Sequence, residues 1–489
     1  MASSTIALAQ KDPDQLADQF LAGAQIDPDF SLIDQLCSLS FSDDPAIACK
    51  ATRATFSVIE FLCDDFSDFG IALTSEVLVR ILQYIRSTPA GSKLDSLLND
   101  FGFTSPEILL ERFKNLYKKA PISFSDRKKV IKIIVLSRVT AGADIAITSI
   151  LVKRLSQTFP SASLVLIGPS HLQEMFEDVP NTRCISYIYR NDGTLFEKMT
   201  SWPELLDIAR EETLGHQTGE VLLFDPDSRL SQLGLLPLID DEHTYIFPSR
   251  ASQARISDNK NLSLLANEWL NTMLAENKKV YPHLTFAAPG MSLYRNFYSA
   301  VKAGGCTFVV TINFGVGNNP AKIIEGHFEE ALLKRLLETP NTVVVLDSGR
   351  GVNELKRIQH LLQVFNNAHV HTAQITDTAI DRFSKPFNHG LIAFKGPLCA
   401  LGKMIDATDC FIGYDSCGQH LAAATRTPTV ILFAGAPNTR FIHRWAPTNK
   451  ETITIPVINE PPNNTSLLSL LNQVETAVNN LRSKTLAPV

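Results

Sequence analysis

Apolar residues recur every three or four positions through the first 118 residues of the chain. This spacing is typical of amphipathic helices, and the clearest runs are FSLIDQLCSLSF, AIACKATRATFSVIEFLCDDF, TSEVLVRILQYIRS and SPEILLERFKNLYKK. Thr74 and Ser105 are suitable N-caps, and Glu107 follows Ser105 in the first turn of its predicted helix. No catalytic cluster is recognisable among these segments. The pattern predicts an all-α domain over residues 1–120 that serves interaction or self-association.

The pattern changes near Pro121. A continuous β-branched run, IKIIVLS (131–137), is typical of a parallel strand that is buried on both faces. The helix-like IAITSILVKRLSQTF and the strand-like SASLVLIGP follow it, which makes a βαβ unit. Further strands are expected at 183–189, 220–225 and 243–247. We therefore predict a Rossmann-like domain over residues 128–280.

A second alternation of strands and helices begins at CTFVVTINFG (306–315). Further strands are expected at 341–347, 368–373, 391–394, 409–415 and 428–434. The sequence predicts a linker at 281–304, a second Rossmann-like domain at 305–460, and a C-terminal helix and tail at 461–489. The expected fold class is α/β, with two parallel sheets facing a cleft behind the all-α domain, because ligands of such sheets bind beyond the carboxyl ends of the strands.

The composition narrows the class of protein. Hydrophobic residues make up 45% of the 489 residues and charged residues 20%, a normal globular balance, and the net charge of −6 argues against a nucleic-acid partner. The eight cysteines are scattered without a CxxC pair, which favours buried thiols in a reducing compartment over disulfides or zinc. The first residues lack a signal-peptide pattern, and no apolar run is long enough to span a bilayer. We expect a cytoplasmic protein with at most peripheral membrane contact.

The loop after the first predicted strand carries a candidate carboxylate. Asp144 stands where the next helix begins, and Gly142 permits a tight turn before it. Asp144 either complements the helix N-terminus or removes a proton from an acceptor hydroxyl. Arg138 and Thr140 lie in the same loop.

Two loops of the second predicted domain have phosphate- and ribose-binding chemistry. Residues 313–322 contain Gly315 and end at Lys322, which offers a point charge to a diphosphate, but they match neither GxGxxG nor a P-loop. This loop is either a phosphate loop or a plain glycine-rich turn. Glu354 follows the next strand and either binds ribose hydroxyls or is an ordinary acid of a first helical turn.

The strongest local feature is FIGYDSCGQHLAAATRTPTVILFAG (411–435). An apolar strand ends at Asp415, Ser416 and Gly418 make a sharp entry, and a helix of small residues follows, whose first amides suit a pyrophosphate. His420 either binds phosphate or stabilises the loop. Cys417 has no evident histidine and acid partners, so a nucleophile is not expected. The donor-side candidates are Asn313, Gly315, Lys322, Glu354, Asp415, Ser416, Cys417, Gly418, Gln419 and His420.

Residues 130–450 resemble glycosyltransferase family 9, the heptosyltransferase-like enzymes with the GT-B fold. The match is carried by DATDCFIGYDSCGQHLAAATRTPTVILFAG with RWAP (444–447) after it, and by IIVLSRVTAGADIAITSILVKRL, which resembles the opening strand, Gly-Asp loop and helix of the family. The resemblance implies that Asp144 is the catalytic base, that Lys322 contacts the donor phosphate and that Glu354 binds the ribose. It also implies that Asp415, Ser416 and His420 form the donor loop.

The chain departs from the family pattern in several places. Ala143 stands where the family has glycine before the aspartate, and Cys417 stands where a glycine follows the serine or threonine. The DPDSRLSQLGLLP segment (225–237) and the helical domain have no counterpart, so the chain resembles a divergent member. The DPDSR part is either a solvated turn or an acceptor-binding loop.

The resemblance implies inverting, metal-independent transfer of a sugar from a nucleoside-diphosphate sugar to an acceptor hydroxyl, without a cofactor. The acceptor is not identified by the sequence, and a glycan, a lipid-linked saccharide and a protein are the expected classes. The acceptor-side candidates are Arg138, Thr140, Asp225 and Arg229. Two alternatives remain open: a sugar-nucleotide-binding or scaffold protein with weakened catalysis, and an epimerase or hydrolase on the same fold.

Overall fold

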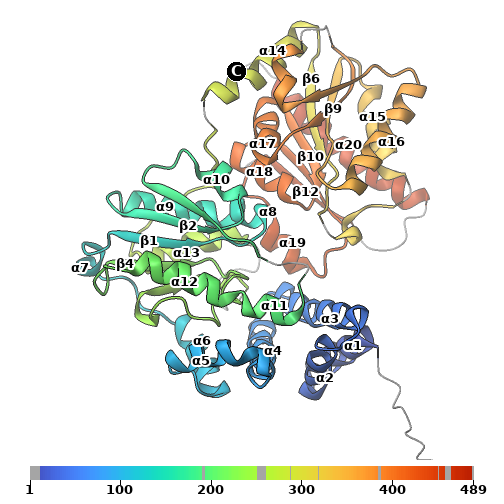
Figure 1. The fold of residues 1–489 in the computed structure, drawn as a ribbon. Helices are drawn as coiled ribbons and strands as arrows, with labels where there is room; N and C mark the ends of the chain where they lie inside the picture. The colour runs from blue at the N-terminus through green and yellow to red at the C-terminus, as the bar shows by residue number, and fades with distance from the viewer. Residues whose placement is uncertain are drawn as a thin grey trace, which may run out of the picture. The chain divides into compact units, whose positions relative to one another are not determined.

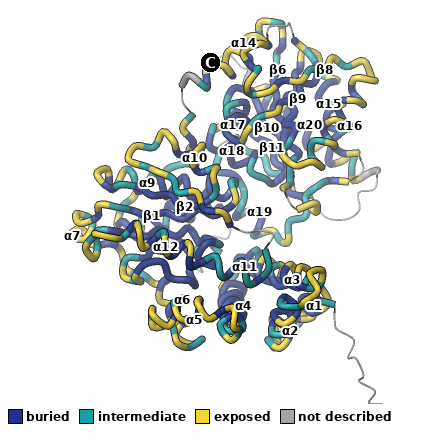
Figure 2. Tube along the Cα trace, viewed as in Figure 1, coloured by how far each residue is buried: buried dark blue, intermediate teal, exposed yellow. Residues whose placement is uncertain are grey.

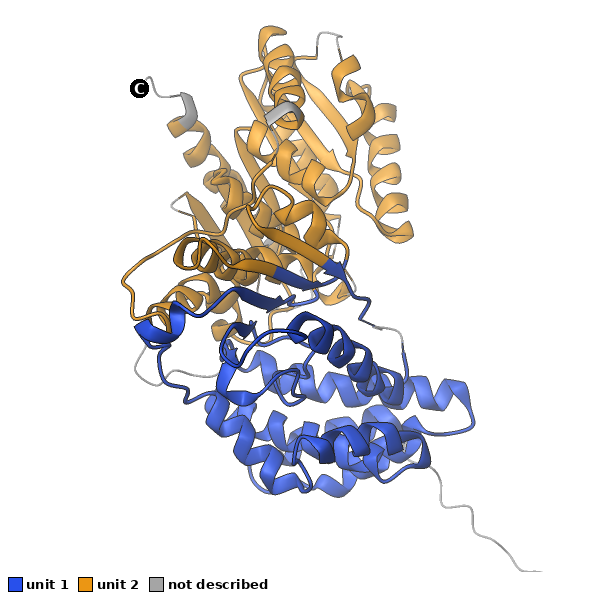
Figure 3. Ribbon diagram, turned by 60° about the vertical axis from the view of Figure 1, so that its left-hand side comes forward, with its two compact units in different colours: residues 1–139, 165–169, 185–257 blue, residues 140–164, 170–184, 258–489 orange. Residues whose placement is uncertain are grey.

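The structure is a computed structural model that describes residues 12–189, 193–250, 260–286, 288–317, 319–325, 327–383, 387–449, 451–457 and 464–486. The chain forms two compact units, each described below by itself (Figure 3). Unit 1 comprises residues 1–139, 165–169 and 185–257, and unit 2 comprises residues 140–164, 170–184 and 258–489. The edges of these units do not coincide with the predicted domain boundaries, which remain predictions.

The N-terminal part of unit 1 is helical, as its apolar spacing predicts. Its helices are α1 (Pro13–Gly23), α2 (Phe30–Ser40), α3 (Pro45–Asp64), α4 (Asp68–Arg86), α5 (Ser92–Asp100), α6 (Pro106–Leu116) and α7 (Phe124–Arg127), with the 3₁₀ turn η1 (Pro89–Gly91) before α5. Ser105 caps α6 by accepting a hydrogen bond from the backbone N–H of Ile108. Thr74 as an N-cap is wrong, because α4 begins earlier and Ser67 caps it. Thr74 lies buried inside that helix.

These helices share one hydrophobic core with the first sheet. A single buried cluster joins helix residues such as Leu36 and Leu82 to strand residues such as Ile134, Val165 and Leu223. Figure 2 shows the same arrangement as dark blue inner faces on the helices and dark blue strands β1 (Lys132–Leu136) and β2 (Ser163–Gly168). The helical segment is therefore packed as part of unit 1 and not as a separate core.

The first sheet has five strands in the order β3-β2-β1-β4-β5. The remaining strands are β3 (Thr182–Ser186), β4 (Val221–Asp225) and β5 (Thr244–Ile246). β1 pairs in parallel with β4, with Ile134 opposite Leu223, and β4 pairs in parallel with β5. The connecting elements are α8 (Ala141–Ala143), η2 (Asp144–Thr148), α9 (Ser149–Thr158), α10 (His171–Phe176), α11 (Leu195–Thr200), α12 (Trp202–Thr213), η3 (Asp241–His243) and α13 (Leu262–Met273).

The second sheet lies in unit 2 and has seven parallel strands in the order β12-β11-β10-β6-β7-β9-β8 (Figure 1). They are β6 (Phe308–Asn313), β7 (Thr342–Asp347), β8 (Thr372–Thr376), β9 (Gly390–Lys395), β10 (Cys410–Tyr414), β11 (Thr429–Phe433) and β12 (Thr452–Pro456). The helical elements are α14 (Ala288–Ala303), η4 (Pro320–Lys322), α15 (Phe328–Glu338), α16 (Val352–Asn367), η5 (Asp377–Arg382), α17 (Leu398–Ala407), α18 (Cys417–Thr425), α19 (Thr439–Trp445) and α20 (Asn464–Leu486). Five of the six strand predictions for this sheet are confirmed. The strand expected at 368–373 begins later, as β8 (Thr372–Thr376), and β12 was not predicted.

None of the helices in the described part of the chain combines the length and the apolar character needed to cross a bilayer.

Candidate functional site

Polar side chains gather where β6, β7 and β10 end, because these strands are neighbours in the second sheet and run parallel. Asn313 ends β6 and donates from Nδ2 to Asp347 Oδ2 at 2.6 Å. Ser416, after β10, donates from Oγ to Asn313 Oδ1 at 3.3 Å. Burial raises the pKa of Asp347 to about 6. The structure thus brings together predicted donor-side residues that are about a hundred positions apart in the chain.

Helix α18 begins at this edge with an uncapped first turn. Ser416 occupies the N-cap position but makes no side-chain hydrogen bond to the helix, because its hydroxyl is directed to Asn313. The first amides of α18 therefore remain suitable for an anion. Gly418 lies against the Phe411 ring, where an added Cβ would stand 2.7 Å from a ring carbon, so a larger residue does not fit. Burial raises the pKa of the Cys417 thiol, which argues against a nucleophile as the sequence does.

Lys322 reaches the same edge from the loop after β6. Its Nζ lies 2.5 Å from Asp415 Oδ2, and Gln419 donates from Nε2 to the other oxygen of Asp415 at 2.5 Å. The side chain of Gln419 is fully buried, and its Oε1 has no hydrogen-bond partner in the described chain. This edge of the sheet therefore holds two different polar groups. The ammonium of Lys322 is already paired, and the side-chain oxygen of Gln419 has no partner in the described chain.

His420 is held as a neutral imidazole. Burial, with a smaller contribution from Lys322, lowers the pKa of His420 to about 3. Its ring stacks edge-on against Trp445, with the centroids 5.8 Å apart. Any contact of His420 with a phosphate at neutral pH would therefore be a hydrogen bond and not an ion pair.

This buried histidine predicts an acid-dependent loss of stability. An unfolded histidine has a pKa of about 6.5, so between that pH and about 3 the unfolded state binds a proton that the folded state does not. The free energy of unfolding should therefore fall with decreasing pH by about 1.4 kcal/mol per pH unit from this residue. The free energy of unfolding is measured by urea unfolding between about pH 6 and 4.5. We expect its dependence on pH to be shallower in His420→Gln than in the wild type, by the equivalent of one bound proton. The exposed His360→Gln is the matched control; a wild-type slope in His420→Gln would contradict the assignment.

Glu354 lies in the first turn of α16 and acts there as a capping acid. Its Oε2 accepts from the backbone N–H groups of Arg350 and Gly351 at 2.9 and 3.3 Å. An added Cβ on Gly315 would stand 3.0 Å from Oε1, so this oxygen lies at the loop after β6. Glu354 therefore lies at the predicted loop after β6, and one of its carboxylate oxygens caps the start of α16.

Asp144 is completely buried in unit 2. It begins η2, a π-helical turn, and Oδ1 accepts from the Thr148 hydroxyl at 2.7 Å. Its Oδ2 lies 2.8 Å from His171 Nε2. His171 was not among the predicted site residues, although its place three residues after the carboxyl end of the parallel strand β2 is a signal that the sequence contains.

The turn that carries Asp144 packs against the first turn of α18. An added Cβ on Gly142 would stand 3.0 Å from a ring carbon of His420 and 3.3 Å from the Cα of Cys417. Both segments belong to unit 2, so this contact lies within one compact unit. The turn that carries the predicted carboxylate and the start of the predicted anion site are therefore neighbours, with too little space at Gly142 for a side chain between them.

Three acceptor-side candidates lie in unit 1. Arg138 and Asp225 belong to a buried polar network, and Arg229 contacts a helix. Arg138 donates from Nη1 to the backbone oxygens of Pro226 and Asp227 and to Ser249 Oγ, at 2.7, 3.0 and 2.7 Å. Burial lowers the pKa of Arg138 to about 10. Arg138 thus fastens the segment after β4 to the end of β1.

The DPDSR segment is not a solvated turn. Asp225 accepts from the backbone N–H of Ser228 at 2.6 Å and from the Ser231 hydroxyl, and burial raises its pKa to about 6. Arg229 donates to Glu60 of α3 at 2.8 Å. Thr140, the fourth candidate, belongs to unit 2 and is exposed. The interpretation of 225–229 as a solvated turn is therefore wrong, because the residues around it bury it.

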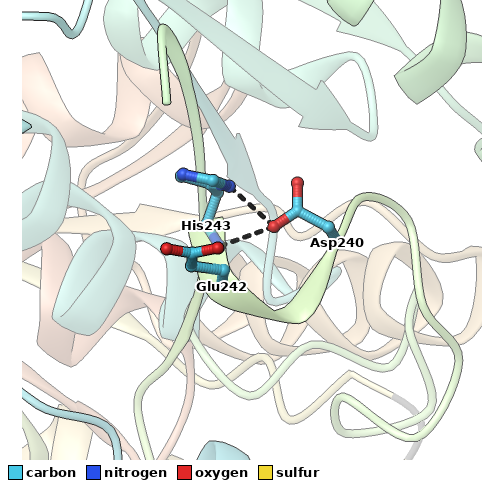
Figure 4. A group of neighbouring side chains, drawn as sticks. All are labelled: Asp240, Glu242 and His243. Carbon is cyan, nitrogen blue, oxygen red and sulfur yellow. Dashed lines mark hydrogen bonds and ion pairs between the residues drawn. The ribbon is translucent and has the colours of Figure 1, made fainter. Parts of the chain in front are cut away.

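One group of described side chains could hold a metal ion: Asp240, Glu242 and His243 (Figure 4). Within this group, Asp240 Oδ1 lies 2.6 Å from His243 Nδ1. The group precedes β5, so it lies at the amino end of a strand, whereas ligands of parallel sheets bind at carboxyl ends. It therefore gives no argument for a metal in the predicted chemistry.

No protein-family model matches the chain, and no curated protein matches it in sequence. Among solved structures, a glycosyl transferase family 9 protein from Veillonella parvula is similar, with a TM-score of 0.51 and 16% identity over 72% of this chain and 98% of that one. The Escherichia coli ADP-heptose LPS heptosyltransferase II has a TM-score of 0.48 and 16% identity, over 73% and 100% of the two chains. The E. coli heptosyltransferase WaaC with ADP has a TM-score of 0.45 and 11% identity, over 71% and 100%.

The likeness to the V. parvula structure confirms the expected fold class, α/β of the GT-B type with two sheets and additional N-terminal helices. At this identity it establishes architecture and not substrate. The chain shares its fold with glycosyltransferase family 9.

Proposed function

We propose that the protein transfers a sugar from a nucleoside-diphosphate sugar to an acceptor hydroxyl, with inversion and without a metal ion. The observation that carries the proposal is the contact of the Asp144 turn with the first turn of α18. In an inverting displacement the acceptor hydroxyl and the leaving group lie on opposite faces of one anomeric carbon, so the proton-accepting group and the anion site must flank the same sugar.

The donor diphosphate is assigned to the start of α18. The uncapped amides of Cys417, Gly418 and Gln419 and the positive end of the helix would stabilise the negative charge that develops on departure. Lys322 would turn from Asp415 to the phosphate.

A binding experiment tests the donor assignment. Titration calorimetry with ADP, UDP and GDP should show that one of them binds, and Lys322→Ala should weaken its binding by about 10–100-fold, because a hydrogen bond to a charged group contributes about 1.5–3 kcal/mol. The change also leaves the Asp415 carboxylate without its 2.5 Å partner, beside the phosphate. Lys334→Ala is the matched control, since Lys334 pairs with Glu330 on an exposed helix face.

Turnover separates the remaining possibilities. Release of nucleoside diphosphate that depends on an added acceptor supports transfer, whereas release without an acceptor indicates a hydrolase. Donor binding without release across all donors and acceptors would identify a binding or scaffold protein. If Lys322→Ala and the wild type bind the nucleoside diphosphate with equal affinity, the assignment of the donor site is wrong.

A further inference from the structure

His171 connects the buried Asp144 to the surface of unit 2. It is the first residue of α10, and its Nε2 lies 2.8 Å from Asp144 Oδ2. The side chain of His171 is 21% exposed, whereas that of Asp144 is 0% exposed. Of this pair, only the imidazole is reachable from outside.

Both oxygens of Asp144 are already in use. Thr148 donates its hydroxyl to Oδ1 at 2.7 Å, and the imidazole occupies Oδ2. Asp144 is fully buried and the imidazole is partly exposed, so an acceptor hydroxyl that approaches this pair from solvent meets the imidazole first.

The pairing also fixes the chemistry of the imidazole. A neutral histidine that donates its Nε2–H to a carboxylate carries its lone pair on Nδ1. A buried acid behind a partly exposed histidine is the arrangement in which the acid orients and the histidine reacts.

We propose that His171 takes the proton from the acceptor hydroxyl and that Asp144 is its positioning residue. This inference rests on the proposed transfer reaction. The acceptor O–H bond breaks, and its proton goes to Nδ1 of His171. The acceptor oxygen forms a bond to the anomeric carbon, and the bond from that carbon to the phosphate oxygen breaks, with its electron pair leaving on the diphosphate. The imidazolium then returns its proton to water.

The test measures nucleoside-diphosphate release from a panel of ADP-, UDP- and GDP-sugars in wild type, His171→Ala and Asp144→Asn. We expect kcat to fall by about 10²–10⁴-fold in His171→Ala, with the donor KM and the Kd for the bound nucleoside diphosphate unchanged. Added imidazole should restore part of the His171→Ala rate, because the site is partly exposed, and should not restore Asp144→Asn. His360→Ala on α16 is the matched exposed control and should keep the wild-type rate.

The outcomes separate this inference from the function on which it rests. A wild-type rate in His171→Ala, or a loss of nucleotide binding and thermal stability without rescue by imidazole, would assign His171 a structural role while the transferase stands. No release by wild type from any donor would overturn the transfer reaction itself.

Discussion

Arg138→Met should lower the free energy of unfolding of unit 1 by about 1–3 kcal/mol, because buried hydrogen-bond acceptors such as the backbone oxygen of Pro226 lose their donor. The carboxylate of Asp227 is completely buried and lies 3.4 Å from Arg138 and 2.6 Å from Arg250. The substitution also removes the donor to Ser249 Oγ. Hydrogen exchange of the β1 and β4 amides measures the effect, since it reports local opening free energies.

The matched control is Arg80→Met. Arg80 pairs with Asp34 on the surface of the helical region, with 49% and 37% of the two side chains exposed. Exposed pairs contribute about 0–1 kcal/mol, so this variant should exchange as the wild type does. A change in acceptor KM in Arg138→Met, without faster exchange, would instead return Arg138 to the acceptor site for which the sequence made it a candidate.

The strands were predictable because of their composition. Continuous β-branched and apolar runs such as those of β1, β6 and β10 occur where a parallel strand is buried on both faces, and helices between them leave few alternatives to a layered α/β fold. β12 was missed because it is a short, partly exposed edge strand, TITIP, that pairs only with β11. Thr74 was misassigned because the helix continues on its amino side through residues that are not strongly periodic.

The sequence predicted the part of the candidate site that depends on where strands end. Polar residues after β6 and β10 had to meet, and Asn313 and Ser416 do. The sequence did not predict that both carboxylate oxygens of Asp144 are hydrogen-bonded, because this depends on a π-helical turn and on the position of the loop after β2. Burial of Asp225 was hidden for a similar reason, since the residues that cover it come from distant segments.

The second large effect concerns the support of the Asp144 turn. Arg154 lies on α9, directly after η2, and its side chain is fully buried. It donates to Asn271 Oδ1, to Glu276 Oε2 and to the backbone oxygen of Lys278, at 2.9, 3.0 and 3.0 Å. These bonds fasten the helix that follows the turn to α13 and the segment after it, all within unit 2.

We expect Arg154→Met to lower the free energy of unfolding by about 3 kcal/mol, measured by urea unfolding with tryptophan fluorescence, to which Trp269 on α13 contributes. Burial alone would raise the pKa of Glu276, but hydrogen bonds from Arg154 and Lys278 hold it below its usual value. In the variant this carboxylate keeps Lys278 at 3.1 Å and loses the hydrogen bond from Arg154. Adding Glu276→Gln should recover part of the loss, because the double variant removes that charge. Arg335→Met, on a partly exposed pair with Glu475, is the control and should lose at most about 1 kcal/mol. If Arg154→Met unfolds as the wild type does while nucleotide release falls, Arg154 acts on the Asp144 turn without stabilising the fold, and the stability argument is wrong.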